Sequence, residues 1–117
     1  MAPSDNRETG HSALPSGMFE VDTLRGGDDL CLRLSGELDL ASVEKLEVAI
    51  RVAEKTTARA IFIDLSDLEF MDSAGLTALL RAYTRTRQDG QRLRFLPSSH
   101  DAVTQLIAVT GTSKIFD

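Results

Sequence analysis

Ser73 is the residue of this sequence whose type and neighbours point most directly to chemistry. It follows Asp72, and the segment Phe70-Met71-Asp72-Ser73-Ala74-Gly75-Leu76 joins an apolar run to a helical pattern. A serine hydroxyl at such a junction has three uses. It can attack a substrate, it can cap the helix by accepting hydrogen bonds from free amides, or it can accept a phosphoryl group.

Catalysis by Ser73 is the least favoured of these uses. A serine nucleophile requires a base within hydrogen-bond reach and an oxyanion hole. The usual nucleophile elbow is Gly-x-Ser-x-Gly, and Met71 stands in the place of its first glycine. The two histidines are His11, near the N-terminus, and His100, which could lie at the same end of the fold as Ser73. A dyad of Ser73 and His100 stays open, but we expect the chain not to be an enzyme.

Metal and nucleotide sites also lack support. Asp39, Asp67 and Asp72 could gather a hard cation, but their spacing matches no loop with defined ligand geometry. The sequence contains neither Gly-x-Gly-x-x-Gly nor a Walker motif, so it predicts no nucleotide site. We therefore expect neither a metal nor a cofactor.

A structural role for the same segment is expected whatever the function. Either the Asp72 carboxylate or the Ser73 hydroxyl should accept hydrogen bonds from the first free amides of the helix. Gly75, early in that helix, is worse than alanine by roughly 1 kcal/mol. We expect close approach by another backbone or by a partner to explain the glycine.

The elements that position Ser73 alternate between strand and helix. Alternating or continuous apolar patterns predict strands over 18–24, 30–35, 60–65 and 93–96. Apolar residues at helical spacing predict helices over 43–55, with Ser42 as N-cap, over 74–88, and over a third segment that Ser98 or Ser99 caps and Gly111 closes. The almost wholly apolar run 60–65 is typical of a strand covered on both faces. The first two strands are expected to form a hairpin.

This order predicts an α/β domain with a mixed, mostly parallel sheet of about four strands and helices packed on it. In such a sheet the strand-to-helix loops gather at the C-terminal ends of the parallel strands. The loops 36–39, 67–73 and 97–100 should meet there. They predict an acidic rim with Ser73 near its centre, made of Glu37, Asp39, Asp67, Glu69 and Asp72.

Length and composition favour a single domain. The chain has 117 residues, and residues 1–17, rich in polar residues, proline and glycine, are expected to be a flexible leader before a domain over 18–117. The net charge of −5 and the lack of a basic cluster argue against nucleic-acid binding. No apolar run reaches the ~18 residues of a membrane span. The single cysteine, Cys31, excludes an intrachain disulfide, and we expect a cytoplasmic protein.

Four segments together resemble the STAS domain, a family that takes its name from sulfate transporters and anti-sigma factor antagonists. The likeness spans about residues 18–116, and the first and third segments at this separation are a specific pair. The segments are Leu34-Ser35-Gly36-Glu37-Leu38-Asp39, Ile61-Phe62-Ile63-Asp64-Leu65, Phe70-Met71-Asp72-Ser73-Ala74-Gly75-Leu76 and Thr110-Gly111.

Within this family the chain is most similar to the stand-alone bacterial anti-sigma factor antagonists. That resemblance implies a partner-switching cycle in which the unmodified protein binds an anti-sigma factor and so frees a sigma factor. The anti-sigma factor is also an ATP-dependent serine kinase that phosphorylates the antagonist, and a serine phosphatase restores binding. The phosphorylated serine corresponds to Ser73, and Asp39 corresponds to an acidic residue implicated in partner contact. The partner surface expected on this basis comprises Glu37, Asp39, Asp72, Ser73, Gly75 and Leu76.

Two further points follow from the resemblance. Relatives usually continue past the Lys-Ile-Phe segment into a last strand or helix, whereas this sequence stops at Asp117, so that either the domain over 18–117 lacks that element or the sequence is shortened. The alternative function is a STAS scaffold subunit of a lipid-transport or stress-sensing complex, which would not be switched by phosphorylation.

Overall fold

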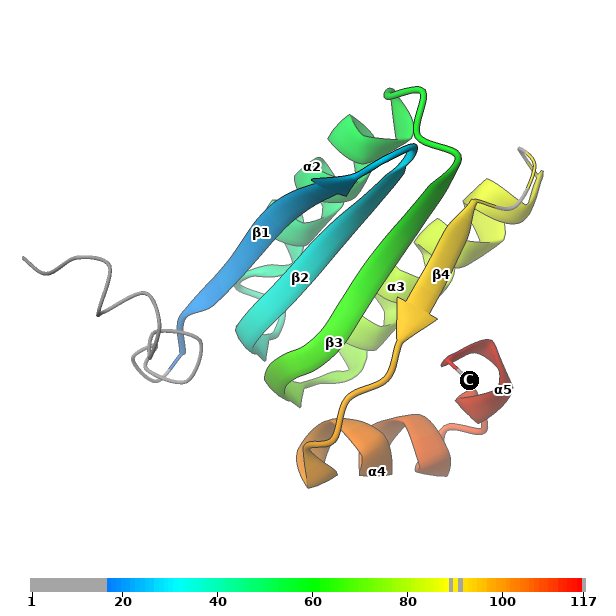
Figure 1. Cartoon of the computed structure of the whole chain (residues 1–117). Helices are drawn as coiled ribbons and strands as arrows, with labels where there is room; N and C mark the ends of the chain where they lie inside the picture. Colours follow the sequence, from blue (N-terminus) through cyan, green and yellow to red (C-terminus); the bar gives the residue numbers. More distant parts are fainter. Residues whose placement is uncertain (1–16, 89, 91, 117) are drawn as a thin grey trace, which may run out of the picture.

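The computed structural model describes residues 17–88, 90 and 92–116, so that the expected leader lies outside the described residues except for Gly17. Strands and helices alternate along the chain as the sequence predicts (Figure 1). The elements in order are β1 (Phe19–Gly26), β2 (Asp29–Leu38), α2 (Val43–Glu54), β3 (Ala60–Met71), α3 (Ser73–Gln88), β4 (Leu93–Leu96), α4 (Asp101–Val109) and α5 (Ser113–Phe116).

The four strands form one sheet in the order β1-β2-β3-β4. β1 and β2 pair antiparallel as a hairpin, whereas β2 with β3 and β3 with β4 pair parallel. The mixed, mostly parallel sheet with helices packed on it confirms the predicted fold class. The parallel pairs place the C-terminal ends of β2 and β3 side by side, directly before α2 and α3.

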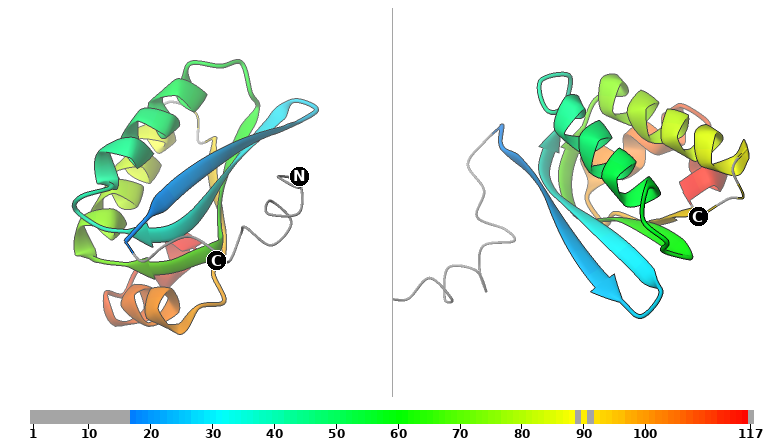
Figure 2. Two further views of the ribbon diagram at one scale, coloured as in Figure 1. Left: turned by 90° about the vertical axis from the view of Figure 1, so that its left-hand side faces the viewer. Right: turned by 90° about the horizontal axis from the view of Figure 1, so that it is seen from above.

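The helices α2 and α3 cover one face of the sheet (Figure 2). Side chains between the sheet and these two helices are fully buried, among them Leu32 of β2, Ile63 of β3 and Leu79 of α3. On the opposite face, Phe62 and Asp64 of β3 are only half-buried. The expectation that this strand is covered on both faces is therefore wrong. Its continuous apolar run reflects a central strand with one fully packed face.

β3 is six residues longer than the run 60–65 predicts, because it ends at Met71. The additional residues pair with the end of β2 through irregular register, with Ser35 opposite Asp67, Gly36 opposite Leu68 and Glu37 opposite Phe70. Gly36 has φ of 90°, which only glycine adopts freely, and this φ accompanies the bulge. Most of the expected loop 67–73 is thus strand, and the turn into α3 is confined to Asp72.

The C-terminal helices close the domain beside β3 and β4. Val103 and Ile107 of α4 are buried, and Phe116 of α5 packs on Phe95 of β4 with ring centroids 4.5 Å apart. The helix α5 was not expected. The N-cap of α4 is His100 and not Ser98 or Ser99, and it makes no side-chain capping bond. The Ser98 hydroxyl instead accepts a hydrogen bond from the His100 amide (3.0 Å) and contacts the Leu68 carbonyl (3.4 Å).

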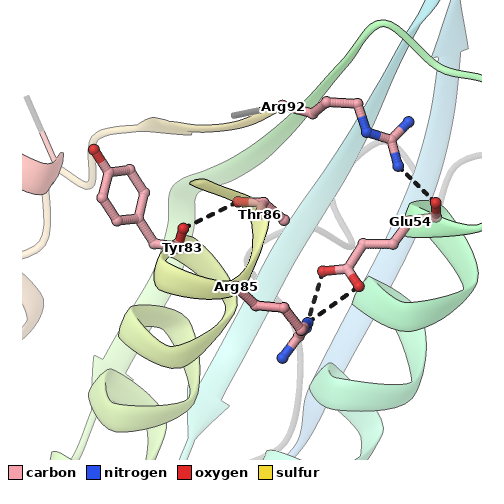
Figure 3. A network of polar contacts seen from close by, with 5 residues as sticks. All are labelled: Glu54, Tyr83, Arg85, Thr86 and Arg92. Carbon is pink, nitrogen blue, oxygen red and sulfur yellow. Dashed lines mark hydrogen bonds and ion pairs between the residues drawn. The ribbon is translucent and has the colours of Figure 1, made fainter. Parts of the chain in front are cut away.

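A polar network ties α2, α3 and β4 together at the end of the sheet remote from Ser73 (Figure 3). The Arg85 guanidinium donates two hydrogen bonds to the Glu54 carboxylate, at 2.9 and 3.2 Å. Arg92 donates to the main-chain carbonyls of Glu54 (2.6 Å), Thr56 (3.2 Å) and Ala58. A cation that satisfies carbonyls at a helix C-terminus also matches the helix dipole. This network therefore fastens the last turn of α2 to the start of β4.

Candidate functional site

Ser73 is the first residue of α3 and its side chain is exposed. Within the described part of the chain, its hydroxyl makes no hydrogen bond. The amides of Ser73 and Ala74, in the first turn of α3, likewise have no acceptor among residues 17–116 as described. An exposed, unengaged hydroxyl beside free helix amides is accessible to a modifying enzyme and can accommodate an anion.

Asp72 is the residue that caps α3. Its Oδ1 accepts a hydrogen bond from the Gly75 amide (3.0 Å), and its carbonyl accepts the first helical bond, from the Leu76 amide (3.0 Å). Of the two caps expected from the sequence, the carboxylate and not the hydroxyl therefore fills the role. The Ser73 hydroxyl therefore has no role in capping α3.

The second carboxylate oxygen of Asp72 reaches a different element. Its Oδ2 accepts a hydrogen bond from the amide of Leu40 (3.3 Å), which lies in the connection between β2 and α2. The Asp72 amide also donates to the Leu38 carbonyl (3.1 Å). Asp72 thus joins the end of β3, the first turn of α3 and the connection after β2, and so links two of the three loops that were expected to meet.

The connection between β2 and α2 is a tight turn of residues 39–42, which we call the Leu40 turn. The Asp39 amide donates to Ser42 Oγ (3.0 Å), and the Ser42 amide donates to Asp39 Oδ1 (3.2 Å). Ser42 does occupy the N-cap position of α2, but its side chain makes no capping bond because it is engaged in this turn. Leu40 projects from the turn with 74% of its surface exposed.

Gly75 is explained by the close approach of Leu38. A Cβ at Gly75 would lie 2.6 Å from Cγ of Leu38 and 3.0 Å from its carbonyl oxygen, closer than side chains tolerate. Of the two expected causes of this glycine, close approach by another part of the chain is the one observed, and it involves the Leu38 side chain even more closely than the Leu38 main chain. Gly75 and Leu76, which are part of the predicted partner surface, are both buried, whereas Ser73 is exposed.

The acidic residues lie where the sequence places them, along the ends of β2 and β3. Glu37 pairs with Phe70, Asp67 pairs with Ser35, and Asp39 and Asp72 follow the two strands. Glu69 is exposed and the other four acidic residues are half-buried. Sequence analysis did not single out the exposed Leu40, for which the signal available was a single apolar residue directly after Asp39.

Other chemistries find no support in the described residues. Among them, no group of three or more histidine, cysteine or acidic side chains is arranged to hold a metal ion. No hydrogen bond joins Ser73 to His100 in that part of the chain, and His100 opens α4. None of the helices described here is long and apolar enough to cross a bilayer.

Several known proteins are similar to this chain in sequence. An anti-sigma-B factor antagonist of Listeria monocytogenes is 29% identical over 93 residues, which cover 80% of this chain and 81% of the relative. The protein of the same name from Staphylococcus aureus is 29% identical over 80 residues, covering 68% of this chain and 73% of the relative.

Solved structures have the same fold. An anti-sigma factor antagonist of Mycobacterium paratuberculosis superimposes with a TM-score of 0.76 and 26% identity, over 87% of either chain. The antagonist SpoIIAA superimposes in its unphosphorylated form with a TM-score of 0.68 and 24% identity, over 86% of either chain. Its phosphorylated form superimposes with a TM-score of 0.62 and 23% identity, over 86% of this chain and 89% of the other. Residues 20–117 match the STAS domain family, and the chain belongs to that family.

Proposed function

We propose that this protein is an anti-sigma factor antagonist that is switched by phosphorylation of Ser73. In its unmodified form it binds an anti-sigma factor that is also a serine kinase, and a sigma factor is thereby freed. Phosphorylation ends the binding, and a serine phosphatase restores it. The protein acts as a regulatory binding module and not as an enzyme, and its place of action is the cytoplasm.

The observation that carries this proposal is the state of Ser73. The hydroxyl is exposed, it makes no hydrogen bond in the described structure, and Asp72 has taken over the capping of α3. Relatives that cover most of this chain are named anti-sigma-B factor antagonists. The fold itself accommodates a phosphate, since SpoIIAA is known in a phosphorylated form.

The modification transfers the γ-phosphoryl group of ATP to Ser73 Oγ. A bond forms between Oγ and phosphorus, the bond from phosphorus to ADP breaks, and the hydroxyl proton is released. The product carries about 1.5 to 2 additional negative charges at neutral pH. Free amides and the dipole at the start of α3 favour an anion there, so the fold should survive the change.

A partner that docks on this end of the molecule experiences the new charge directly. A unit charge about 4 Å from a like charge costs roughly 4 kcal/mol at an effective dielectric of 20. That free energy corresponds to roughly a thousandfold loss of affinity. We assign Glu37, Asp39, Asp72 and Ser73 to the contact surface. The buried Gly75 and Leu76 contribute by holding the first turn of α3 against Leu38.

Affinity capture with two baits tests the proposal. One bait is the unmodified protein and the other carries phosphoserine at position 73, installed during translation. From lysate of the source bacterium, the unmodified bait should retain a protein with an ATP-binding kinase domain that the phosphorylated bait does not. With ATP, that purified protein should add one phosphoryl group to the wild type and none to Ser73→Ala.

Thr77→Ala is the matched control, because it removes another exposed hydroxyl one turn further along α3. It should be phosphorylated like the wild type. Equal modification of Ser73→Ala, or equal binding of the kinase to both baits, would refute the switch. Capture of the same multi-subunit assembly by both baits would support a STAS scaffold instead.

A further inference from the structure

The Leu40 turn presents a large, exposed apolar side chain on a residue whose main-chain amide donates to Asp72, the residue before Ser73. Leu40 is 74% exposed, while the main chain beneath it is held by hydrogen bonds between Asp39 and Ser42 and by Asp72. Isolated exposed leucines are common on protein surfaces and need no explanation. This one differs because its position depends on the residue that precedes Ser73.

The two carboxylate oxygens of Asp72 accept hydrogen bonds from different parts of the chain. Oδ1 accepts from the Gly75 amide of α3, and Oδ2 accepts from the Leu40 amide. Main-chain amides of Ser73 and Ala74, which have no acceptor in the described structure, lie in the same first turn. A phosphate on Ser73 would stand beside this carboxylate and repel it, while the free amides of Ser73 and Ala74 would donate hydrogen bonds to the phosphate oxygens.

We propose that Leu40 is an apolar anchor for the anti-sigma factor and that Asp72 is the latch through which phosphorylation of Ser73 releases it. This inference rests on the proposed function and adds the route from the phosphate to the contact surface. In the unmodified protein, Asp72 holds the Leu40 amide and the anchor is preorganised, which favours binding. In the phosphorylated protein, the like charges move the carboxylate away from Leu40 and the anchor loses its fixed position.

The surroundings of Leu40 define what it fits. Glu37 and Asp39 lie just before it in the chain, and Asp72 contacts its amide. The described residues within this turn carry no cationic side chain. The matching surface on the anti-sigma factor is therefore an apolar pocket in which the leucine is desolvated, with basic side chains opposite Glu37 and Asp39 and none opposite Ser73.

The latch can be tested without any partner, by measuring how fast single amides exchange with water by NMR. Unmodified wild-type protein should exchange the Leu40 amide about fivefold or more slowly than phosphoserine-73 protein, because the hydrogen bond protects it. The Ala41 amide, which has no acceptor in the described structure, serves as the internal reference. Unchanged exchange of the Leu40 amide on phosphorylation would overturn the latch.

Asp72→Asn is a variant that separates the two tasks of this side chain. An asparagine has one acceptor oxygen, so it can cap the Gly75 amide but then turns an NH₂ group toward the Leu40 amide. The Gly75 amide should stay protected while the Leu40 amide loses protection. Glu69→Gln removes an exposed negative charge from the same end of β3 and should alter neither amide. Equal protection of Leu40 in Asp72→Asn and in the wild type would also overturn the latch.

The anchor is tested by binding to the purified anti-sigma factor. Leu40→Ala should weaken binding of the unmodified protein about tenfold, as expected for the loss of a desolvated apolar contact. Val52→Ala removes a comparably exposed side chain at the far end of α2 and should leave affinity unchanged. Unchanged affinity of Leu40→Ala would refute the anchor. If phosphoserine at position 73 abolishes binding while Leu40→Ala does not weaken it, the proposed function stands and this inference fails.

Discussion

Gly75 of α3 lies so close to Leu38 of β2 that a single methyl group between them would be 2.6 Å from the leucine Cγ. The contact is also the point where the first turn of α3 meets the end of the sheet, next to the Asp72 amide that donates to the Leu38 carbonyl. The glycine therefore sets the position of the helix that begins at Ser73.

We predict that Gly75→Ala lowers the free energy of unfolding by about 1–3 kcal/mol, the usual cost of overpacking, although alanine is the better helix former. Urea denaturation measures the change. Gly26→Ala is the control, because a Cβ at Gly26 meets no atom within 4 Å. A Gly75→Ala variant as stable as the Gly26→Ala variant would contradict the packing argument.

The charge tolerance of the α3 N-terminus gives a second prediction. Ser73→Asp should change the free energy of unfolding by less than about 1 kcal/mol, because the helix dipole favours an anion at this end. Gln88→Asp places the same charge at the last residue of α3, where the dipole disfavours it, and should be the less stable of the two. Thermal melts of both variants check this order. The reverse order would show that Ser73 is not in an anion-tolerant position.

Arg92 supplies a third prediction, at the opposite end of the fold. Arg92→Lys keeps the charge but cannot reach the carbonyls of Glu54, Thr56 and Ala58 together. We expect a loss of about 1–3 kcal/mol in the free energy of unfolding, measured by urea denaturation. Arg94→Lys, an exposed position two residues later, should be close to neutral. Equal stability of the two variants would remove the proposed role of the guanidinium.

The thiol of Cys31 gives a fourth prediction, which concerns pH. Burial, and to a lesser degree the Asp64 carboxylate, raises the pKa of the Cys31 thiol above its ordinary value, while Arg33 acts in the opposite direction. Alkylation by iodoacetamide should therefore have a higher pH midpoint in the folded protein than in urea, because the thiolate is the nucleophile. Asp64→Asn should lower the folded midpoint, and Glu20→Gln, on β1, should not.

The same pKa shift has a consequence for stability. The neutral thiol is favoured in the folded state, so its contribution is fully present below the thiol pKa of the unfolded chain. It is lost as the pH rises through the raised pKa of the folded state. An alkylation midpoint that is equal in folded and unfolded protein would contradict both statements.

Much of the architecture could be predicted from periodicity, but the ends of several elements could not. β4 and α3 agree with the sequence prediction to within one residue, because Gly90 and Pro97 bound them clearly. β3 continues to Met71 because it pairs with the bulged end of β2, and polar residues such as Ser66 and Asp67 conceal that pairing in the sequence. The cap of α4 was assigned to a serine by propensity, whereas Ser98 instead bonds the His100 amide and contacts Leu68.

For the candidate site, too, the general placement of the residues could be predicted from the sequence, but their individual contacts could not. The sequence places acidic residues and Ser73 at one end of the sheet, since strand order alone brings those residues together. It offers two candidates for the cap of α3, and only the structure chooses Asp72. The links from Asp72 to Leu40 and from Gly75 to Leu38 join residues more than thirty positions apart, and no local pattern encodes them.

The hydrogen bonds of Arg92 and Arg85 fasten the helices to one another and to the sheet at the pole opposite Ser73. The hydrogen bonds that hold the helices and the exposed Leu40 turn therefore lie at opposite ends of one small domain. Duplicated copies of such a chain can therefore diverge in the sequence of this turn, and so in the protein that the turn contacts, while the hydrogen bonds of Arg85 and Arg92 at the other end keep each copy folded.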